Sequence, residues 1–146
     1  MKKLTIATLI ALSATVASAA EFGVTSSRAD DRNSFGVTVG QQFGTVGVTA
    51  GAERTSVGSN DQNRFSLIGA YDVVKLGPVT VSAKAGGAYL DNQTGADGYA
   101  AVVGAGLSVP VTKAVTAGVD FTRQYGQDRV SQFDGNRVTA GLKFKF

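Results

Sequence analysis

The sequence predicts an all-β fold, an eight-stranded antiparallel up-and-down transmembrane β-barrel, and three observations predict it. Large apolar residues alternate with small or polar residues in eight segments of the chain. Within each segment, the positions between the large apolar residues, which we call the small-residue parity, hold mainly glycine, serine and threonine. These residues suit the interior of a narrow barrel. Aromatic residues gather toward both ends of the segments, with Val, Ala and Leu between them, as expected at two membrane interfaces.

The alternation defines the strands in chain order. The eight predicted strands are residues 22–27, 35–40, 46–53, 64–73, 79–90, 99–109, 115–125 and 138–146. Tight connections are expected at 42–44, 75–78 and 110–113, and longer polar loops at 27–34, 54–63, 91–98 and 126–135. Because antiparallel neighbours alternate in direction, all short turns should lie at one end of the barrel and all long loops at the other.

The first twenty residues have the pattern of a secretory signal peptide. Lys2 and Lys3 form a positive start, residues 4–16 are mostly apolar, and small residues follow up to a cleavage site near Ala19 or Ala20. The apolar stretch is too short to span a bilayer as a helix. The predicted organisation is therefore a signal peptide at 1–20 and a single barrel domain at 21–146.

Composition excludes several classes of function. The chain of 146 residues has no cysteine and no histidine, so disulfides, thiolate metal sites and His-dependent catalytic triads are excluded. The formal net charge of +3 falls to +1 once Lys2 and Lys3 are removed, which leaves 12 basic and 11 acidic residues. A near-neutral chain argues against nucleic-acid binding. We expect no enzyme activity, no metal and no cofactor.

Charged residues on the small-residue parity should point into the barrel. They are Glu53, Arg64, Asp72, Lys84, Asp120, Arg137, Lys143 and Lys145. Lys84 and Asp120 should lie nearest the middle and are a candidate plug. Asp72, Lys143 and Lys145 should lie toward the short turns, and the other three near the long loops. Buried charges need partners, so these residues either form static ion pairs that fill the lumen or a gate that opens when pairs exchange.

Arginine is confined to the long loops and the adjoining strand ends. Guanidinium groups bind phosphate bidentately. If the long loops face the cell exterior, these side chains could bind lipopolysaccharide phosphates, and the alternative is ordinary loop solubility balanced by neighbouring aspartates. The candidate contacts are Arg28, Arg32, Arg54, Arg123 and Arg129.

The last strand ends on a ring, in strict alternation. Its outward residues are Val138, Ala140, Leu142, Phe144 and Phe146. With the signal peptide and the eight strands, this ending resembles small bacterial outer-membrane β-barrels of the OmpA transmembrane-domain and OmpX type. The resemblance covers the chain after residue 20 and implies recognition of the last strand by the outer-membrane assembly machinery. The peptidoglycan-binding domain of full OmpA-type proteins is absent, so cell-wall tethering is not expected.

The resemblance implies an integral protein of the Gram-negative outer membrane, porin-like in architecture, in contact with lipid and lipopolysaccharide, and monomeric. The expected role is structural or surface interaction, through membrane integrity or adhesion. Two alternatives stay open. One is a narrow pore for ions or small solutes. The other is a soluble periplasmic lipocalin-like binder, in which the apolar parity would face inward.

Overall fold

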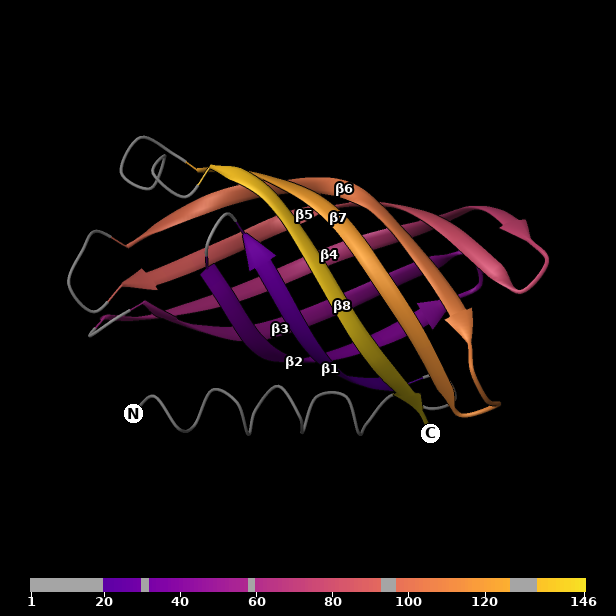
Figure 1. The fold of residues 1–146 in the computed structure, drawn as a ribbon. Helices are drawn as coiled ribbons and strands as arrows, with labels where there is room; N and C mark the ends of the chain where they lie inside the picture. The colour runs from indigo at the N-terminus through magenta and orange to yellow at the C-terminus, as the bar shows by residue number, and fades with distance from the viewer. Residues whose placement is uncertain (1–19, 30–31, 58–59, 93–96, 127–133) are drawn as a thin grey trace.

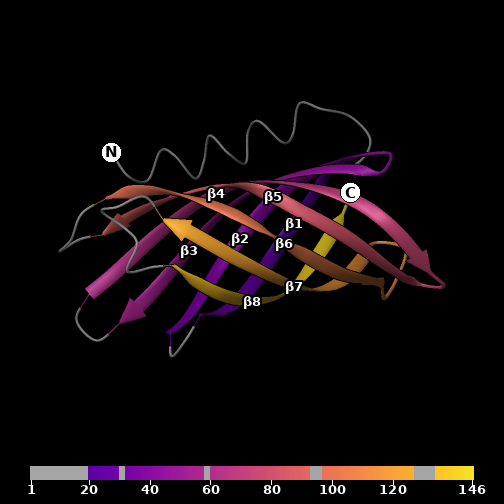
Figure 2. The same ribbon diagram turned by 90° about the horizontal axis from the view of Figure 1, so that it is seen from above.

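The computed structural model describes residues 20–29, 32–57, 60–92, 97–126 and 134–146. These residues form a closed barrel in which each strand pairs with its sequence neighbours and β8 pairs with β1. Figures 1 and 2 show the strands running obliquely around the barrel, with the three short turns and the C-terminus at one end. We call this the short-turn end and the opposite one the loop end. The predicted fold class is confirmed, while the expected signal peptide lies almost wholly outside the described residues.

All eight strands pair antiparallel with both neighbours. They are β1 Ala20–Ala29, β2 Arg32–Phe43, β3 Val46–Val57, β4 Asn60–Leu76, β5 Val79–Asn92, β6 Gly98–Pro110, β7 Val115–Gly126 and β8 Gly135–Lys145. Each is long enough for the 9–11 residues or so that a tilted strand needs to cross a bilayer. In the described part of the chain, no helix is long and apolar enough to span a membrane.

The apolar parity faces outward. Leu67, Val103, Leu107 and Phe121 are 44–60% exposed, whereas polar Ser27, Ser34 and Thr55 are at most 3% exposed. A soluble barrel would bury the first group and expose the second, because apolar surface is driven out of water. The structure therefore rules out the soluble lipocalin-like alternative. The exposed face is suited to lipid.

Strand lengths correct the predicted connections. Two of the four expected loops, 27–34 and 54–63, are largely strand, so β1 and β2 are separated by only two residues, as are β3 and β4. The expected loops at 91–98 and 126–135 correspond to the longer connections at 93–97 and 127–134. The prediction was wrong for the first two loops, because polar residues do not end a strand whose backbone ladder can continue. Two of the three expected tight turns also shorten, to 44–45 and 77–78, and each begins on a glycine at positive φ. The third, expected at 110–113, lies at 111–114.

A break in the strand register changes which side chains at the end of β4 face the lumen. Asp72 pairs with Ser82 and Val74 with Val81, which leaves Val73 unpaired as a β-bulge. Val73 and Val74 are both exposed as a result. Because of the bulge, Lys75 faces the lumen and lines a cavity there. Lys75 was expected in a turn, but it belongs to β4.

Candidate functional site: a sealed lumen above a polar vestibule

The most buried charges of the barrel meet near the loop end. Glu53 on β3 lies between two arginines, with its Oε2 atom 2.7 Å from Nη1 of Arg64 and 2.7 Å from Nη1 of Arg137. Ser27 Oγ donates to Oε1 of the same carboxylate at 2.6 Å. Arg64 Nε donates to Gln124 Oε1 at 3.2 Å. We call these five residues the Glu53 cluster.

The contacts within the Glu53 cluster compensate the free-energy cost of burying its charged groups. Glu53 is 8% exposed and Arg64 is 7% exposed, and isolated charges at such depth are strongly unfavourable. Strand register explains the meeting, because Glu53 and Arg64 are directly paired between β3 and β4. Sequence parity placed Glu53, Arg64 and Arg137 together near the loop end, but it did not identify Ser27 or Gln124 as their partners.

Apolar side chains fill the lumen beside the Glu53 cluster. Leu90 is 1% exposed and Val102 is 2% exposed, although both sit on the inward, mostly polar parity. Leu90 pairs with Arg64 across β4 and β5, and Val102 pairs with Gln124 across β6 and β7. The barrel is therefore packed at this level. We call this packed level, formed by the Glu53 cluster with Leu90 and Val102, the seal. The large apolar residues at inward positions of the sequence indicated it, but this signal was not recognised.

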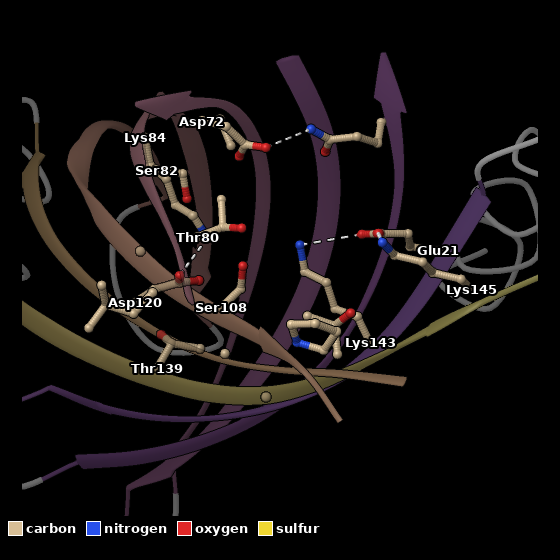
Figure 3. Close-up of a pocket in the computed structure, with 18 of the residues that line it drawn as sticks. Glu21, Asp72, Thr80, Ser82, Lys84, Ser108, Asp120, Thr139, Lys143 and Lys145 are labelled. Atoms are coloured by element: carbon tan, nitrogen blue, oxygen red, sulfur yellow. Dashed lines mark hydrogen bonds and ion pairs between the residues drawn. The ribbon is translucent and has the colours of Figure 1, made fainter. Parts of the chain in front are cut away.

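Below the seal lies an open cavity that we call the vestibule. Its volume is about 270 Å³, and it extends from Thr25 and Thr139 to Gly44 and Pro110 near the short turns. Figure 3 shows its polar side chains converging from several strands. At the inner end, Thr139 Oγ1 lies 2.9 Å from Ser27 Oγ, so a hydroxyl–hydroxyl contact joins the vestibule lining to the Glu53 cluster.

Lys84 and Asp120 face each other across the vestibule wall, with Nζ 2.5 Å from Oδ1 (Figure 3). Their side chains are 13% and 29% exposed, so they are wetter than the Glu53 cluster. Gly106 makes room for them, since a Cβ there would lie 2.5 Å from Asp120 Oδ1 and 2.8 Å from Lys84 Cε. The candidate plug thus lines a cavity, and the tighter packing lies one level above it.

The remaining vestibule charges lie toward the short-turn end. Glu21 is 3.5 Å from the Nζ atoms of both Lys143 and Lys145. Asp72 accepts a long 3.5 Å hydrogen bond from Gln42. The sequence pattern placed Asp72, Lys143 and Lys145 at this end. It also contains a signal for Glu21, which alternates in step with the inward Gly23 and Thr25, but Glu21 was not identified as an inward residue. Glu21 was overlooked because it adjoins the expected cleavage site.

The candidate lipopolysaccharide contacts lie around the loop end. Arg28, Arg32, Arg54 and Arg123 are all exposed, and the guanidinium of Arg123 stands 5.3 Å from the ring centre of Tyr125. Arg54 is paired with the 69% exposed Phe35, so a cation adjoins an aromatic ring on the outer face. Arg129 lies outside the described residues.

The outward residues of β8 form a continuous apolar edge of the seam with β1. Leu142 pairs with Val24 and Phe144 with Phe22. Beyond the strand, the Phe146 N–H donates to the Ala20 carbonyl at 3.3 Å, and its ring is 75% exposed. Val138, Ala140, Leu142, Phe144 and Phe146 thus share one face that is directed away from the lumen.

Metal-binding chemistry finds no support in the described segments, where no group of three or more acidic residues could hold an ion. The model of the YfaZ precursor family matches residues 1–131. The chain belongs to the YfaZ precursor family. No curated protein matches this YfaZ-family chain. A precursor family, a closed barrel and an apolar outer band make it a secreted outer-membrane protein of Gram-negative bacteria.

Solved structures similar to this YfaZ-family barrel are small transmembrane barrels. The de novo designed barrel TMB2.3 is 19% identical with a TM-score of 0.59, covering 88% of this chain and 94% of the design. Neisserial surface protein A is 16% identical with a TM-score of 0.57, covering 88% and 95%. Ail of Yersinia pestis, solved in a phospholipid nanodisc, is 11% identical with a TM-score of 0.58, covering 89% and 100%. At these identities the likeness is one of fold.

Proposed function

We propose that this barrel acts as a structural and surface-interaction protein of the outer membrane, without a catalytic step. The observation that carries the proposal is the packed level formed by the Glu53 cluster with Leu90 and Val102. A lumen filled by paired charges and apolar side chains supports a structural role in the membrane rather than conduction through an open channel. An eight-stranded barrel is in any case just wide enough for its own side chains.

Planar-bilayer conductance tests this proposal. The barrel, purified from outer membranes and shown to be folded by heat-modifiable migration on a gel, should give no reproducible current steps. Reproducible steps from the unmodified protein would contradict a sealed lumen and move the pore function to first place.

A narrow pore is the second candidate, because the vestibule already opens the lumen toward the short-turn end. Its inner end adjoins the Glu53 cluster, because Thr139 in its lining contacts Ser27, which donates to Glu53. Conduction would require the arginines to exchange partners so that the packed level opens. Glu53→Gln, which removes their shared counter-charge, should produce steps if this candidate is right and none if the lumen serves only as a core.

The surface partner in this proposal is lipopolysaccharide. In barrels of this class the short turns face the periplasm and the loops face outward. That orientation puts Arg28, Arg54 and Arg123 at the outer leaflet, where arginine forks suit phosphate groups. The proposal also includes a monomeric barrel whose last strand is read by the outer-membrane assembly machinery, as the outward apolar face of β8 supports.

A further inference from the structure

The vestibule carries more positive than negative charge. Lys75, Lys84, Lys143 and Lys145 line it together with the carboxylates Glu21, Asp72 and Asp120. Lys84 is tightly paired, but Lys143 and Lys145 share Glu21 at 3.5 Å each. Within the described ranges, Lys75 has no acidic partner. One carboxylate therefore serves two lysines and a third lysine is unpaired, which leaves cationic donors available to a ligand.

Hydroxyl groups add further donors to the same cavity. The hydroxyl-bearing residues of its lining are Thr25, Thr80, Ser82, Ser108, Thr116 and Thr139. Thr25 Oγ1 is buried without a hydrogen-bond partner. A buried hydroxyl that lacks a partner is unfavourable unless water or a ligand satisfies it. The unsatisfied Thr25 hydroxyl at the inner end and the unpaired Lys75 ammonium group at the outer end thus line one space.

The chemistry of this lining selects for an anion. The three carboxylates do not form a metal-binding group in the described part of the chain, and each faces a lysine or an amide instead. Ammonium and hydroxyl groups both donate to oxyanions, and hydrogen bonds to charged groups are the stronger kind. At about 270 Å³, the cavity is smaller than typical drug-sized pockets, so it suits a compact ligand.

We propose that the vestibule is a binding site for a phosphate group that enters from the short-turn end. Lys143 and Lys145 turn from Glu21 toward the phosphate, Lys75 adds the third positive charge, and the wall hydroxyls donate to the remaining oxygens. Lys84 stays with Asp120 and closes the inner wall. The site is independent of conductance, because it needs only the open lower half of the lumen. The phosphate can belong to a small solute or to a phospholipid headgroup.

Nuclear magnetic resonance titration tests the site. The barrel, purified from outer membranes, is exchanged into a maltoside detergent that carries no phosphate, and amide shifts are followed while inorganic phosphate is added against a constant-ionic-strength chloride background. Saturable shifts are expected at Gly106, Ser108 and Thr116, which line the vestibule, and not at Gly69 on the outer face. A parallel titration with short-chain phosphatidylglycerol identifies the source. A response to phosphate indicates a solute, and a response to the lipid alone indicates a headgroup.

Matched variants make the test specific. The double variant Lys143→Gln and Lys145→Gln should weaken binding roughly tenfold to a hundredfold, because it removes charged donors. Glu21→Gln should strengthen binding, since it removes the carboxylate that competes for both lysines. Lys113→Gln lies at the same end in the β6–β7 turn but outside the cavity lining and should change nothing.

Three results would overturn the proposal. The first is the absence of saturable shifts with either phosphate or lipid. The second is an equal loss in the Lys113 variant, which would indicate unspecific attraction. The third is weaker rather than stronger binding in Glu21→Gln. Heat-modifiable migration confirms that each variant is folded before its titration is read.

Discussion

The main-chain N–H of Phe146 donates to the carbonyl oxygen of Ala20, at an N···O distance of 3.3 Å. This contact extends the β1–β8 pairing one step beyond its last ladder pair, Glu21 with Lys145. The backbone of Phe146 therefore has a fixed place at the barrel seam, and this residue takes part in closing the barrel.

Deleting Phe146 should affect assembly more than stability. Loss of the hydrogen bond alone should cost about 1 kcal/mol of unfolding free energy in lipid, whereas delivery to the outer membrane should fall sharply if the assembly machinery reads the terminal ring. Phe146→Ala keeps the backbone contact and separates the two effects. Equal amounts of folded Phe146→Ala and wild-type barrel in outer membranes would contradict a role for the ring in assembly.

Leu107→Arg tests the lipid-facing surface. Leu107 is 44% exposed and its cross-strand neighbours are Val81 and Val119. A charge near the bilayer midplane should destabilise the barrel by roughly 2–4 kcal/mol, measured by urea unfolding in lipid vesicles. The control is Val111→Arg in the β6–β7 turn, which should cost about 0–1 kcal/mol because it lies near an interface. Equal losses at both positions would argue against a membrane-embedded face.

Glu53→Gln should destabilise the barrel strongly. The change leaves the guanidinium groups of Arg64 and Arg137 buried without their shared counter-charge. Breaking a buried ion pair by removing one partner costs roughly 3–5 kcal/mol. Asp120→Asn, whose partner Lys84 lies in the wetter vestibule, should cost clearly less in the same unfolding assay. The reverse order would show that the vestibule pair, and not the Glu53 cluster, holds the lumen together.

Gly106→Ala should disturb the Lys84–Asp120 pair. The added methyl group would come within 2.5 Å of Asp120 Oδ1, and overpacking of this kind typically costs about 1–3 kcal/mol. Gly69→Ala is the matched control on the outer face, where the nearest atom would be a carbonyl oxygen 3.6 Å away. Altered amide shifts at Thr80 and Ser82 should accompany only the first change, and unchanged shifts would mean that the pair accommodates the methyl group.

Replacing Arg28, Arg54 and Arg123 together by Gln should reduce the lipopolysaccharide that copurifies with the barrel. All three are exposed on outward positions near the loop end. Phosphate analysis of the purified protein, after equal detergent washing, measures the loss, with Lys113→Gln as the control at the short-turn end. Undiminished lipopolysaccharide in the triple variant would remove these arginines from the proposed contacts.

Period-two alternation predicted the strand count, the antiparallel order and the outward face, because each side chain's side of the sheet follows from its parity alone. It also placed eight charged residues on the inward side, but it missed Glu21 and Lys75, which line the vestibule as well. Strand ends were predicted less well. Ser34 was placed in a loop and Ser27 at the boundary between strand and loop, yet they are paired with each other and buried inside the barrel.

Contacts across the lumen could not be predicted from parity. Ser27 and Glu53 are joined through space by barrel curvature and strand stagger, which alternation does not specify. The bulge at Val73 has no local signature such as glycine or proline, and it alone decides that Lys75 lines the vestibule. Glu21 was missed for a different reason, because the signal-peptide pattern hid the start of β1.

Only two residues separate β1 from β2 and β3 from β4. The β5–β6 and β7–β8 connections, at 93–97 and 127–134, are the longer ones, and both belong to the second half of the chain. The second half of the chain therefore supplies most of the residues that lie between strands at the loop end. In the orientation proposed above, an epitope inserted between β7 and β8 should be accessible to an antibody outside the cell, and an insertion between β1 and β2 would have to interrupt two strands that are only two residues apart.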